Sequence, residues 1–276
     1  MVGVMSQIPH PFVAMVAGET SGDLLASLVL QGLQADLPHI HAAGIGGHRM
    51  AEAGFDAWWP SERLAVHGYS AELVKRLWGI LRIRKQLVQR LSANKPQIFV
   101  GVDAPDFNLG VEERLRAQGI KTVHFVCPSI WAWRPERVEK IRRAADHVLC
   151  IFPFEPALLA QHGIAATYVG HPLANVIPLK PDRAAARRAL GVPESSDVLA
   201  VLPGSRASEV NYIAKPFFRA VALLLQQRPS LTVLVPAVPA LRARIDALAA
   251  ECGIADRIRV LDGQSHLALE ACDCTL

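Results

Sequence analysis

One loop of this sequence concentrates the groups suited to acid–base chemistry. Asp103, Asp106 and Asn108 directly follow the apolar run Ile98–Val102. If that run is a buried strand, Asp103 lies at the rim of a sheet, partly shielded from water, where a carboxylate can accept a proton from a hydroxyl. One of these residues could instead cap the next helix, but three exceed what a cap requires. We therefore predict a catalytic Asp103, with Asp106 and Asn108 binding substrate.

The loop after the first apolar run, Phe12–Ala17, reads Gly-Glu-Thr-Ser-Gly-Asp. Its glycines permit a tight turn, and Ser21 could cap the helix that follows. The spacing matches neither a P-loop nor a complete dinucleotide-binding motif. An ordinary strand-to-helix turn explains the loop equally well. Carboxylates at a strand end could also bind sugar hydroxyls, so Glu19, Ser21 and Asp23 are candidate substrate-binding residues.

A third loop combines two tryptophans with a cation after the apolar run Thr122–Val126. Its residues Ser129, Trp131, Trp133 and Arg134 could present an aromatic platform to a sugar face or an acyl chain, with the guanidinium available to phosphate. The alternative is that the tryptophans pack on the helix beneath them. We count all four as candidate substrate-binding residues.

A fourth loop has the residues of an anion site. Gly204, Ser205 and Arg206 follow the apolar run Val198–Leu202, and Glu209 comes shortly after. A Gly-Ser turn at the start of a helix exposes backbone N–H groups to an anion, and Arg206 adds a bidentate donor. The sequence thus predicts a diphosphate site that needs no metal. His171, between Gly170 and Pro172, is a further candidate for substrate binding, although a lone histidine is more often structural.

The elements that must position these loops alternate between strand and helix along the whole chain. Short apolar runs separated by helical patterns predict parallel sheets built from right-handed βαβ units. Besides the runs named above, we expect strands at Ile40–Ile45, His147–Ile151, Thr167–Val169, Leu231–Val235 and Ile258–Leu261, and a strand begins again at the end of the chain. Ligands of such sheets bind outside the carboxyl ends of the strands.

Three prolines between Gly170 and Pro181 interrupt the pattern and predict a domain boundary. We expect one Rossmann-like domain over residues 1–170 and a second over residues 171–276. The second has only about three strands and an unfinished fourth, fewer than a Rossmann-like half needs to cover both faces of its sheet. The sequence therefore reads as C-terminally truncated.

The helix expected at Ser70–Ala93 combines an apolar stripe with a basic surface. Leu73, Leu77, Ile80, Leu81, Leu87, Val88 and Leu91 recur at helical spacing and predict a core-facing side. On the other side we place Lys75, Trp78, Arg82, Ile83 and Lys85. A basic face with apolar residues among its charges can bind anionic lipid, although a solvated surface helix explains the pattern at least as well.

Composition excludes several classes of protein. A net charge of +4 gives no reason to expect a nucleic-acid partner. No apolar run reaches the roughly 20 residues of a membrane-spanning helix, and no basic residue precedes the first run as in a signal peptide. Five scattered cysteines fit reduced thiols, and Cys272 and Cys274 lack a second ligand pair, so we expect a cytoplasmic protein without a metal site.

Taken together, these segments resemble the lipid-A-disaccharide synthase family. The resemblance rests on Val16–Asp23, Val100–Asn108, Pro128–Arg134 and Leu202–Arg206, which occur in the family's order. It implies a GT-B-type α/β fold of two facing Rossmann-like domains. It also implies inverting transfer of 2,3-diacylglucosamine from UDP to the 6-hydroxyl of 2,3-diacylglucosamine 1-phosphate (lipid X).

The resemblance assigns roles and partners as well. It implies that Asp103 is the general base, that Arg206 binds the donor phosphate, and that Gly204, Ser205 and Glu209 belong to the UDP site. No cofactor is implied. The expected surroundings are the anionic cytoplasmic face of the inner membrane, where the protein is peripheral, and a homodimer. The alternatives are another GT-B enzyme, such as an epimerase or a peptidoglycan-precursor transferase, and an inactive remnant that binds nucleotide or lipid.

Overall fold

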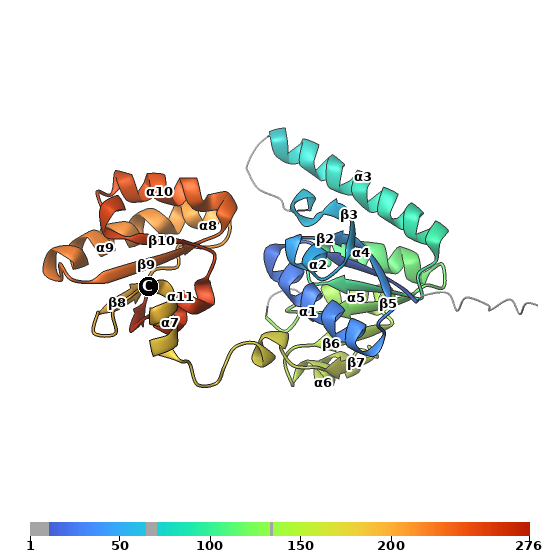
Figure 1. The fold of residues 1–276 in the computed structure, drawn as a ribbon. Helices are drawn as coiled ribbons and strands as arrows, with labels where there is room; N and C mark the ends of the chain where they lie inside the picture. Colours follow the sequence, from blue (N-terminus) through green and yellow to red (C-terminus); the bar gives the residue numbers. More distant parts are fainter. Residues whose placement is uncertain (1–10, 65–70, 133–134) are drawn as a thin grey trace, which may run out of the picture. The chain divides into compact units, whose positions relative to one another are not determined.

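A computed structural model describes residues 11–64, 71–132 and 135–276, except for the side chains of residues 62 and 71–76. The chain forms two compact units that divide between Val176 and Ile177, inside the proline-containing stretch 170–181. Each unit is an α/β domain built on a parallel sheet, and each is described by itself below (Figure 1).

Unit 1 contains, within the described residues, a seven-stranded sheet of order β3-β2-β1-β4-β5-β6-β7. Every neighbouring pair is parallel. The strands are β1 (Phe12–Ala17), β2 (His41–Gly46), β3 (Asp56–Pro60), β4 (Ile98–Val102), β5 (Lys121–Phe125), β6 (His147–Cys150) and β7 (Ala166–Tyr168). The first strand, β1, lies in the middle of this sheet, and the order of the strands reverses between β1 and β4. Such a switch point opens a crevice at the carboxyl ends of the strands.

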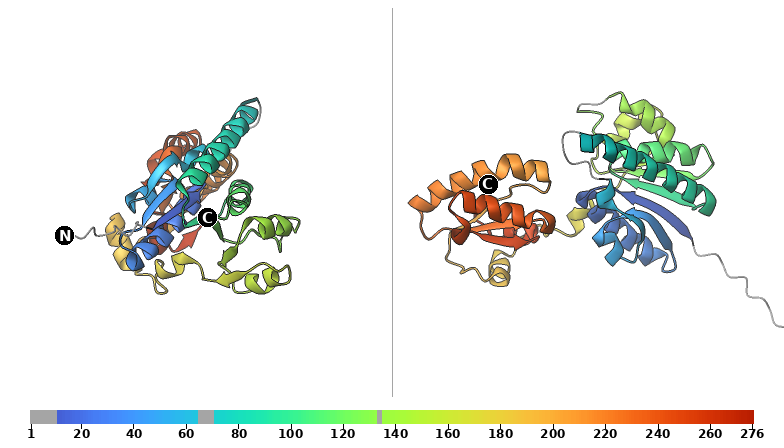
Figure 2. Two further views of the ribbon diagram at one scale, coloured as in Figure 1. Left: turned by 90° about the vertical axis from the view of Figure 1, so that its right-hand side faces the viewer. Right: turned by 90° about the horizontal axis from the view of Figure 1, so that it is seen from above.

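Helices cover both faces of this sheet, as the views in Figure 2 show. They are α1 (Thr20–Asp36), α2 (His48–Glu52), α3 (Ala71–Asn94), α4 (Pro105–Arg116), α5 (Arg137–Ala144) and α6 (Glu155–Ala160). Apolar side chains of α1 and α2 pack on one face, and those of α3 and α4 on the other. Burial on both faces explains why the strands are continuous apolar runs. None of the described helices is long and apolar enough to cross a membrane.

Unit 2 repeats the same arrangement on a smaller scale. Its sheet has the order β10-β9-β8-β11 and is parallel throughout. The strands are β8 (Val198–Ala200), β9 (Thr232–Ala237), β10 (Arg259–Asp262) and β11 (Cys274–Thr275), and the helices are α7 (Arg183–Leu190), α8 (Ala207–Glu209), α9 (Lys215–Gln227), α10 (Arg242–Glu251) and α11 (Ser265–Ala271). Its switch point lies between β8 and β11, where Leu202 donates its backbone N–H to the Leu276 carbonyl.

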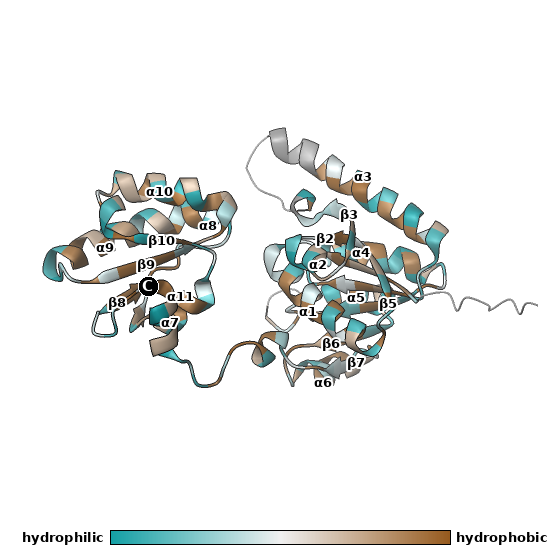
Figure 3. Cartoon of the chain, viewed as in Figure 1, coloured by the Kyte–Doolittle hydropathy of each residue, from teal (hydrophilic) through white to brown (hydrophobic). Residues whose placement is uncertain are grey.

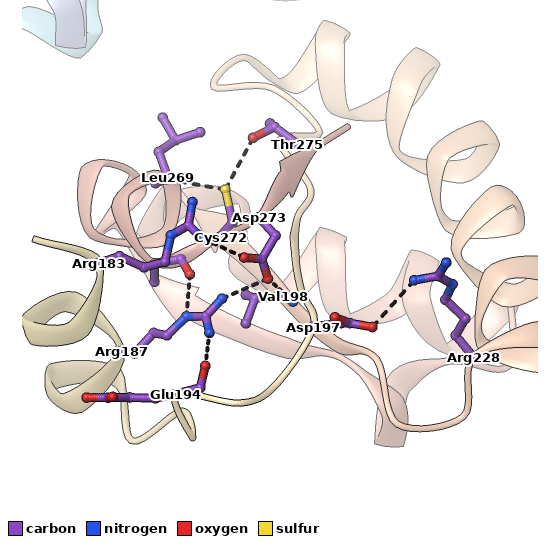
Figure 4. Close-up of polar contacts among 11 residues, drawn as sticks. Arg183, Arg187, Glu194, Asp197, Val198, Arg228, Leu269, Cys272, Asp273 and Thr275 are labelled. Atoms are coloured by element: carbon purple, nitrogen blue, oxygen red, sulfur yellow. Dashed lines mark hydrogen bonds and ion pairs between the residues drawn. The ribbon is translucent and has the colours of Figure 1, made fainter. Parts of the chain in front are cut away.

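A polar cluster holds α7 against the end of the chain in unit 2 (Figure 4). The Asp273 carboxylate forms ion pairs with Arg183 at 2.8 Å and Arg187 at 2.7 Å. It also accepts the backbone N–H of Val198 at 2.9 Å. This N–H bond and the two arginines hold the pKa of Asp273 below its usual range. The carboxylate therefore stays charged and ties α7 to the first strand of the sheet.

Candidate active site

The predicted catalytic loop lies at the switch point of unit 1. Gly18 follows β1 and Ala104 follows β4, and these two strands are neighbours. A side chain added at Gly18 would place its Cβ 3.0 Å from the Cβ of Ala104. Glycine therefore allows the two loops to approach each other, and Asp103 stands at the centre of the carboxyl edge of the sheet.

The backbone of this loop is strained. Asp103 and Ala104 have φ angles of 51° and 42°, a left-handed conformation that costs about 1–2 kcal/mol per L-residue. Val126, which follows the neighbouring β5, has a φ of 76°. Strain of this kind persists only where the surroundings enforce it, and it gathers at functional sites. Part of the enforcement is the bond from the Asp103 N–H to the Phe125 carbonyl, at 2.9 Å.

The Asp103 side chain is half-buried. Among the described residues its carboxylate has no hydrogen-bond or ion-pair partner. It is not a helix cap, because the N-cap position of α4 is Ala104 and no side chain caps that helix. A carboxylate left available at a sheet edge can accept a proton from a bound hydroxyl.

The two other polar residues of the loop differ sharply from Asp103. Asp106 is exposed and forms an ion pair with Arg137 at 2.6 Å. Asn108 is fully buried, and its side-chain nitrogen donates to main-chain carbonyls only. The prediction that Asn108 contacts substrate is therefore wrong for this arrangement, because no surface of the side chain is exposed.

The Asp23 carboxylate is also engaged in hydrogen bonds within the protein. Its side chain is 4 % exposed. One carboxylate oxygen accepts the backbone N–H groups of Gly47 at 2.8 Å and Met50 at 3.2 Å, and the other accepts that of Arg49 at 3.0 Å. These are the free donors at the start of α2, so Asp23 caps a helix from a distance. This burial corrects the assignment of Asp23 to sugar binding.

The remaining residues predicted in the first loop lie at the start of α1. Glu19 is exposed at the N-cap position, and its side chain makes no cap bond there. Ser21 is exposed inside the helix, so the prediction that it caps α1 is wrong. His171 is exposed as well, and its Nδ1 accepts the backbone N–H of Leu173 at 3.2 Å. Substrate binding by these three residues stays a prediction.

The tryptophan loop joins an aromatic cluster that the sequence did not predict. Trp131 is 50 % exposed and packs edge-on against Phe152 and Phe154, with ring centroids 6.4 and 5.3 Å away. Both phenylalanines come directly after β6. Their position after an expected strand, at the same edge of the sheet as the tryptophan loop, could have predicted the cluster. Ser129, in the same loop as Trp131, is exposed. Trp133 and Arg134 lie outside the described residues. The cluster offers an apolar surface at the carboxyl edge of β5 and β6.

Beneath this cluster, Cys127, Cys150 and Glu155 bring their ligand atoms within 4.8 Å of one another. All three residues are buried. A hydrogen bond with Cys150, together with burial, raises the pKa of the Cys127 thiol. Burial also raises the pKa of Glu155. Cys127 and Cys150 pack in the buried core of unit 1 beside Ile141 and Val148.

Helix α3 exposes a different surface from the one predicted. Leu77 and Leu81, expected in the core, are 46 % and 51 % exposed, and Trp78 is 70 % exposed. Ile83, expected at the membrane, is 9 % exposed and packs in the core with Leu87 and Leu91, so that assignment is wrong. Figure 3 shows apolar and polar patches alternating along the described part of α3.

The basic residues predicted on α3 fall into two groups. Arg82 and Lys85 are exposed. The side chain of Lys75 lies outside the described residues. The described part of α3 thus presents Leu77, Trp78 and Leu81 beside Arg82 and Lys85.

In unit 2 three residues of the predicted anion site, Gly204, Ser205 and Glu209, line a pocket of about 340 Å³, and Arg206 is not among the residues that line it. The pocket lies at the carboxyl ends of β8, β9 and β10, as expected for a ligand site in a parallel sheet. It is lined by Leu202, Gly204, Ser205, Glu209, Pro236, Ala237, Val238, Gly263 and Ser265. The five residues after Glu209 in this list were not predicted, although each follows or ends an expected strand.

Glu209 itself occupies the N–H groups of this turn. Its Oε2 accepts the backbone N–H groups of Ser205 at 2.8 Å and Arg206 at 3.1 Å, and its Oε1 pairs with the Arg206 guanidinium at 2.7 Å. The Ser205 N–H in particular holds the pKa of Glu209 below its usual range. Gly204 is required here, since a Cβ at its φ of 116° would lie 2.4 Å from the Glu209 Cβ. The prediction that this turn exposes its N–H groups to an external anion is therefore wrong for Ser205 and Arg206, because the Glu209 carboxylate accepts both.

Comparison with known proteins identifies the family. A family model described as lipid-A-disaccharide synthetase matches residues 13–276. The chain belongs to this family. Lipid-A-disaccharide synthase from Verminephrobacter eiseniae is 65 % identical over 264 residues, which cover 96 % of this chain and 68 % of the relative. The protein of that name from Albidiferax ferrireducens is 60 % identical over 267 residues, 97 % of this chain and 69 % of the relative.

Solved structures support the GT-B-type fold of lipid-A-disaccharide synthases for this chain. UDP-GlcNAc 2-epimerase from Neisseria meningitidis, bound to UDP-GlcNAc, matches with a TM-score of 0.61 at 13 % identity, over 94 % of this chain and 74 % of that one. MurG from Acinetobacter baumannii matches with a TM-score of 0.51 at 14 % identity, over 97 % and 72 %. At such identities the likeness shows the fold alone. The family shows that the chain is a glycosyltransferase of lipid A biosynthesis.

Proposed function

We propose that this protein transfers 2,3-diacylglucosamine from UDP to the 6-hydroxyl of 2,3-diacylglucosamine 1-phosphate and releases UDP. The proposal is carried by the family match over residues 13–276 together with the Asp103 carboxylate, which is half-buried and has no partner among the described residues. Inversion at the anomeric carbon follows from a single displacement that uses one general base.

In the proposed reaction, the Asp103 carboxylate accepts the proton of the acceptor hydroxyl while that oxygen attacks C1 of the donor sugar. The bond between C1 and the diphosphate oxygen breaks, and its electron pair leaves with UDP. The fixed position of Asp103 at the sheet edge supports this role, because a general base must lie within hydrogen-bond reach of the proton that it removes.

The leaving diphosphate is proposed to bind the pocket of unit 2. The Arg206 guanidinium offers the paired donors that phosphate oxygens accept. Two proteins of similar fold were solved with a uridine nucleotide, the N. meningitidis epimerase with UDP-GlcNAc and S. aureus MnaA with UDP. Positive charge placed at the developing anion stabilises the transition state more than the ground state.

The proposed reaction is tested by incubating the protein with UDP-2,3-diacylglucosamine and 2,3-diacylglucosamine 1-phosphate. We expect equimolar disaccharide 1-phosphate and UDP, measured by mass spectrometry. Because the curated relatives are longer than these 276 residues, the assay includes the chain extended to their length. Release of UDP without disaccharide, or epimerisation of UDP-GlcNAc, would favour another GT-B enzyme.

We further propose that α3 contacts the cytoplasmic face of the inner membrane, where lipid substrates of this kind reside. Leu77, Trp78 and Leu81 form an exposed apolar surface, and Arg82 and Lys85 lie beside it. Amphipathic helices that combine such residues bind the interface of anionic bilayers. A homodimer stays a prediction.

Replacing Arg82 and Lys85 with serine is expected to weaken binding to anionic vesicles at low salt. Each cation near an anionic surface contributes about 1 kcal/mol, so the affinity should fall roughly 10- to 30-fold, less at high salt. Sedimentation with phosphatidylglycerol vesicles measures the change. A matched control replaces Arg114 and Arg142, which are exposed on other helices, and should bind normally. Equal sedimentation of all three proteins would show that α3 is only a solvated surface.

A further inference from the structure

A cluster of buried polar side chains lies directly behind the catalytic loop. Asn108 and Glu112 face the sheet from α4, and His124 faces them from β5. All three side chains are fully buried. Polar groups in such a position lose their contacts with water, so each needs a compensating interaction. None of the three can touch a substrate directly, and the proposed chemistry leaves them without a role.

Asn108 acts on the backbone on both sides of the strained loop. Its side-chain nitrogen lies 2.8 Å from the Asp103 carbonyl, 3.2 Å from that of Val102 and 3.3 Å from that of Val16. One amide group thus joins the end of β1, the end of β4 and the catalytic residue itself. The Asp103 bond is the shortest of the three, and it holds the carbonyl that immediately precedes Ala104, the second strained residue.

Glu112 and His124 hold α4 close enough to the sheet for Asn108 to reach these carbonyls. Glu112 Oε1 lies 2.7 Å from His124 Nδ1, which joins α4 to β5. The helix comes close because residue 101 is glycine. A Cβ at Gly101 would lie 2.1 Å from Glu112 Oε1 and 2.9 Å from the Asn108 Cβ. Asn108 and Glu112, one helical turn apart, therefore pack together on β4, the strand that immediately precedes Asp103.

We propose that Asn108 is the positioning residue of Asp103 and that the Glu112–His124 pair supports it by fixing α4 against β4 and β5. This inference rests on the proposed role of Asp103 as general base. A left-handed aspartate followed by a left-handed alanine persists only where its surroundings over-determine it. The three carbonyls bound by Asn108 supply that constraint at the turn. A cluster serving only general stability has no need to converge on the carbonyl of the catalytic residue.

The test compares Asn108→Ala in two backgrounds, the otherwise unchanged enzyme and Asp103→Asn. In the first, kcat should fall about 10- to 100-fold with little change in KM, because the base is displaced while binding surfaces remain. In the second, the residual rate should fall less than about twofold, because Asn108 acts through a base that is already absent. The control is Asn94→Ala, since Asn94 also donates to a main-chain carbonyl, that of Arg90, but on α3.

An equal fractional loss of kcat in both backgrounds would overturn the inference, and so would a normal kcat in folded Asn108→Ala. If that variant does not fold, Glu112→Gln and Glu112→Leu replace it. The glutamine keeps an acceptor for His124 and should retain most of kcat, whereas the leucine should lose kcat only when Asp103 is present. If Glu112→Leu lowered kcat by the same factor with and without Asp103, that result would also count against the inference. Near-normal turnover of Asp103→Asn alone would instead contradict the proposed function, so the two failures are distinguishable.

Discussion

Turnover of the Asp103→Asn variant is expected to fall about 10²- to 10⁴-fold, the contribution of a general base. Asparagine keeps the size of the side chain and tolerates the left-handed backbone of residue 103 better than most residues do. The strained loop should therefore survive, and only the proton acceptor is lost. Steady-state formation of disaccharide measures kcat, and urea unfolding checks that stability is retained.

Asp197→Asn provides a matched control for this experiment. It makes the same chemical change in unit 2, where the Asp197 carboxylate is exposed and paired with the exposed Arg228. Removing an exposed ion pair costs little, about 0–1 kcal/mol of stability, and leaves the proposed base intact. Comparable losses of kcat in both variants would contradict a specific role for Asp103, and unchanged turnover in Asp103→Asn would exclude it as the base.

Much of the fold could be predicted because strands buried on both faces are apolar throughout. The run Phe12–Ala17 was expected and is β1 with the same bounds, and the strand expected at the end of the chain is β11. The strand β3 was missed. It lies at the edge of the sheet, its residues are exposed or half-buried, and its two tryptophans stand between an aspartate and a proline. An edge strand lacks the continuous apolar signal of the central ones.

The direction of a loop side chain could not be predicted from its residue type. Asp23 and Asp103 both follow central strands, yet one carboxylate is buried against Gly47, Arg49 and Met50. Those donors come from a part of the chain more than twenty residues away, so local spacing gives no sign of them. Asn108 was predicted to face the substrate, but its side chain faces the sheet. Gly101 on β4 leaves the room that the Asn108 side chain occupies there, and the residues around Asn108 give no sign of this.

On α3 the predicted apolar stripe was confirmed for Ile80, Leu87, Val88 and Leu91, which pack in the core, and wrong for Leu77 and Leu81, which are exposed. Leu77, Leu81 and Leu87 recur at helical spacing, but among the described side chains of α3 the core contacts come mainly from Ile83, Leu87 and Leu91. Leu77 and Leu81 stay exposed. Periodicity shows that a helix has an apolar side, but not how much of its length finds a partner.

In the anion loop of unit 2, the charges of Glu209 and Arg206 are expected to determine the affinity for UDP. Glu209 already fills the N–H groups of the turn and pairs with Arg206. An arriving diphosphate must therefore share the guanidinium with a carboxylate whose lowered pKa keeps it ionised. The binding contribution of Arg206 is its attraction to phosphate less the weakening of this ion pair, which is partly exposed and of modest strength.

Arg206→Ala is expected to weaken UDP binding by at most about 1.5–3 kcal/mol, or roughly 10- to 150-fold, because competition from Glu209 reduces the full value of a charge-assisted hydrogen bond. Isothermal calorimetry with UDP measures it, and Arg228→Ala, which breaks an exposed pair with Asp197 in the same unit, should bind UDP normally. The variant Glu209→Gln distinguishes the loss of a direct phosphate contact from a loss of order in the loop. It keeps an acceptor for the Ser205 N–H but removes the competing charge, so UDP should bind as tightly or more tightly. If Glu209→Gln weakened UDP binding as much as Arg206→Ala does, the loss of affinity would come from disorder of the loop. A direct contact between Arg206 and phosphate would then be refuted.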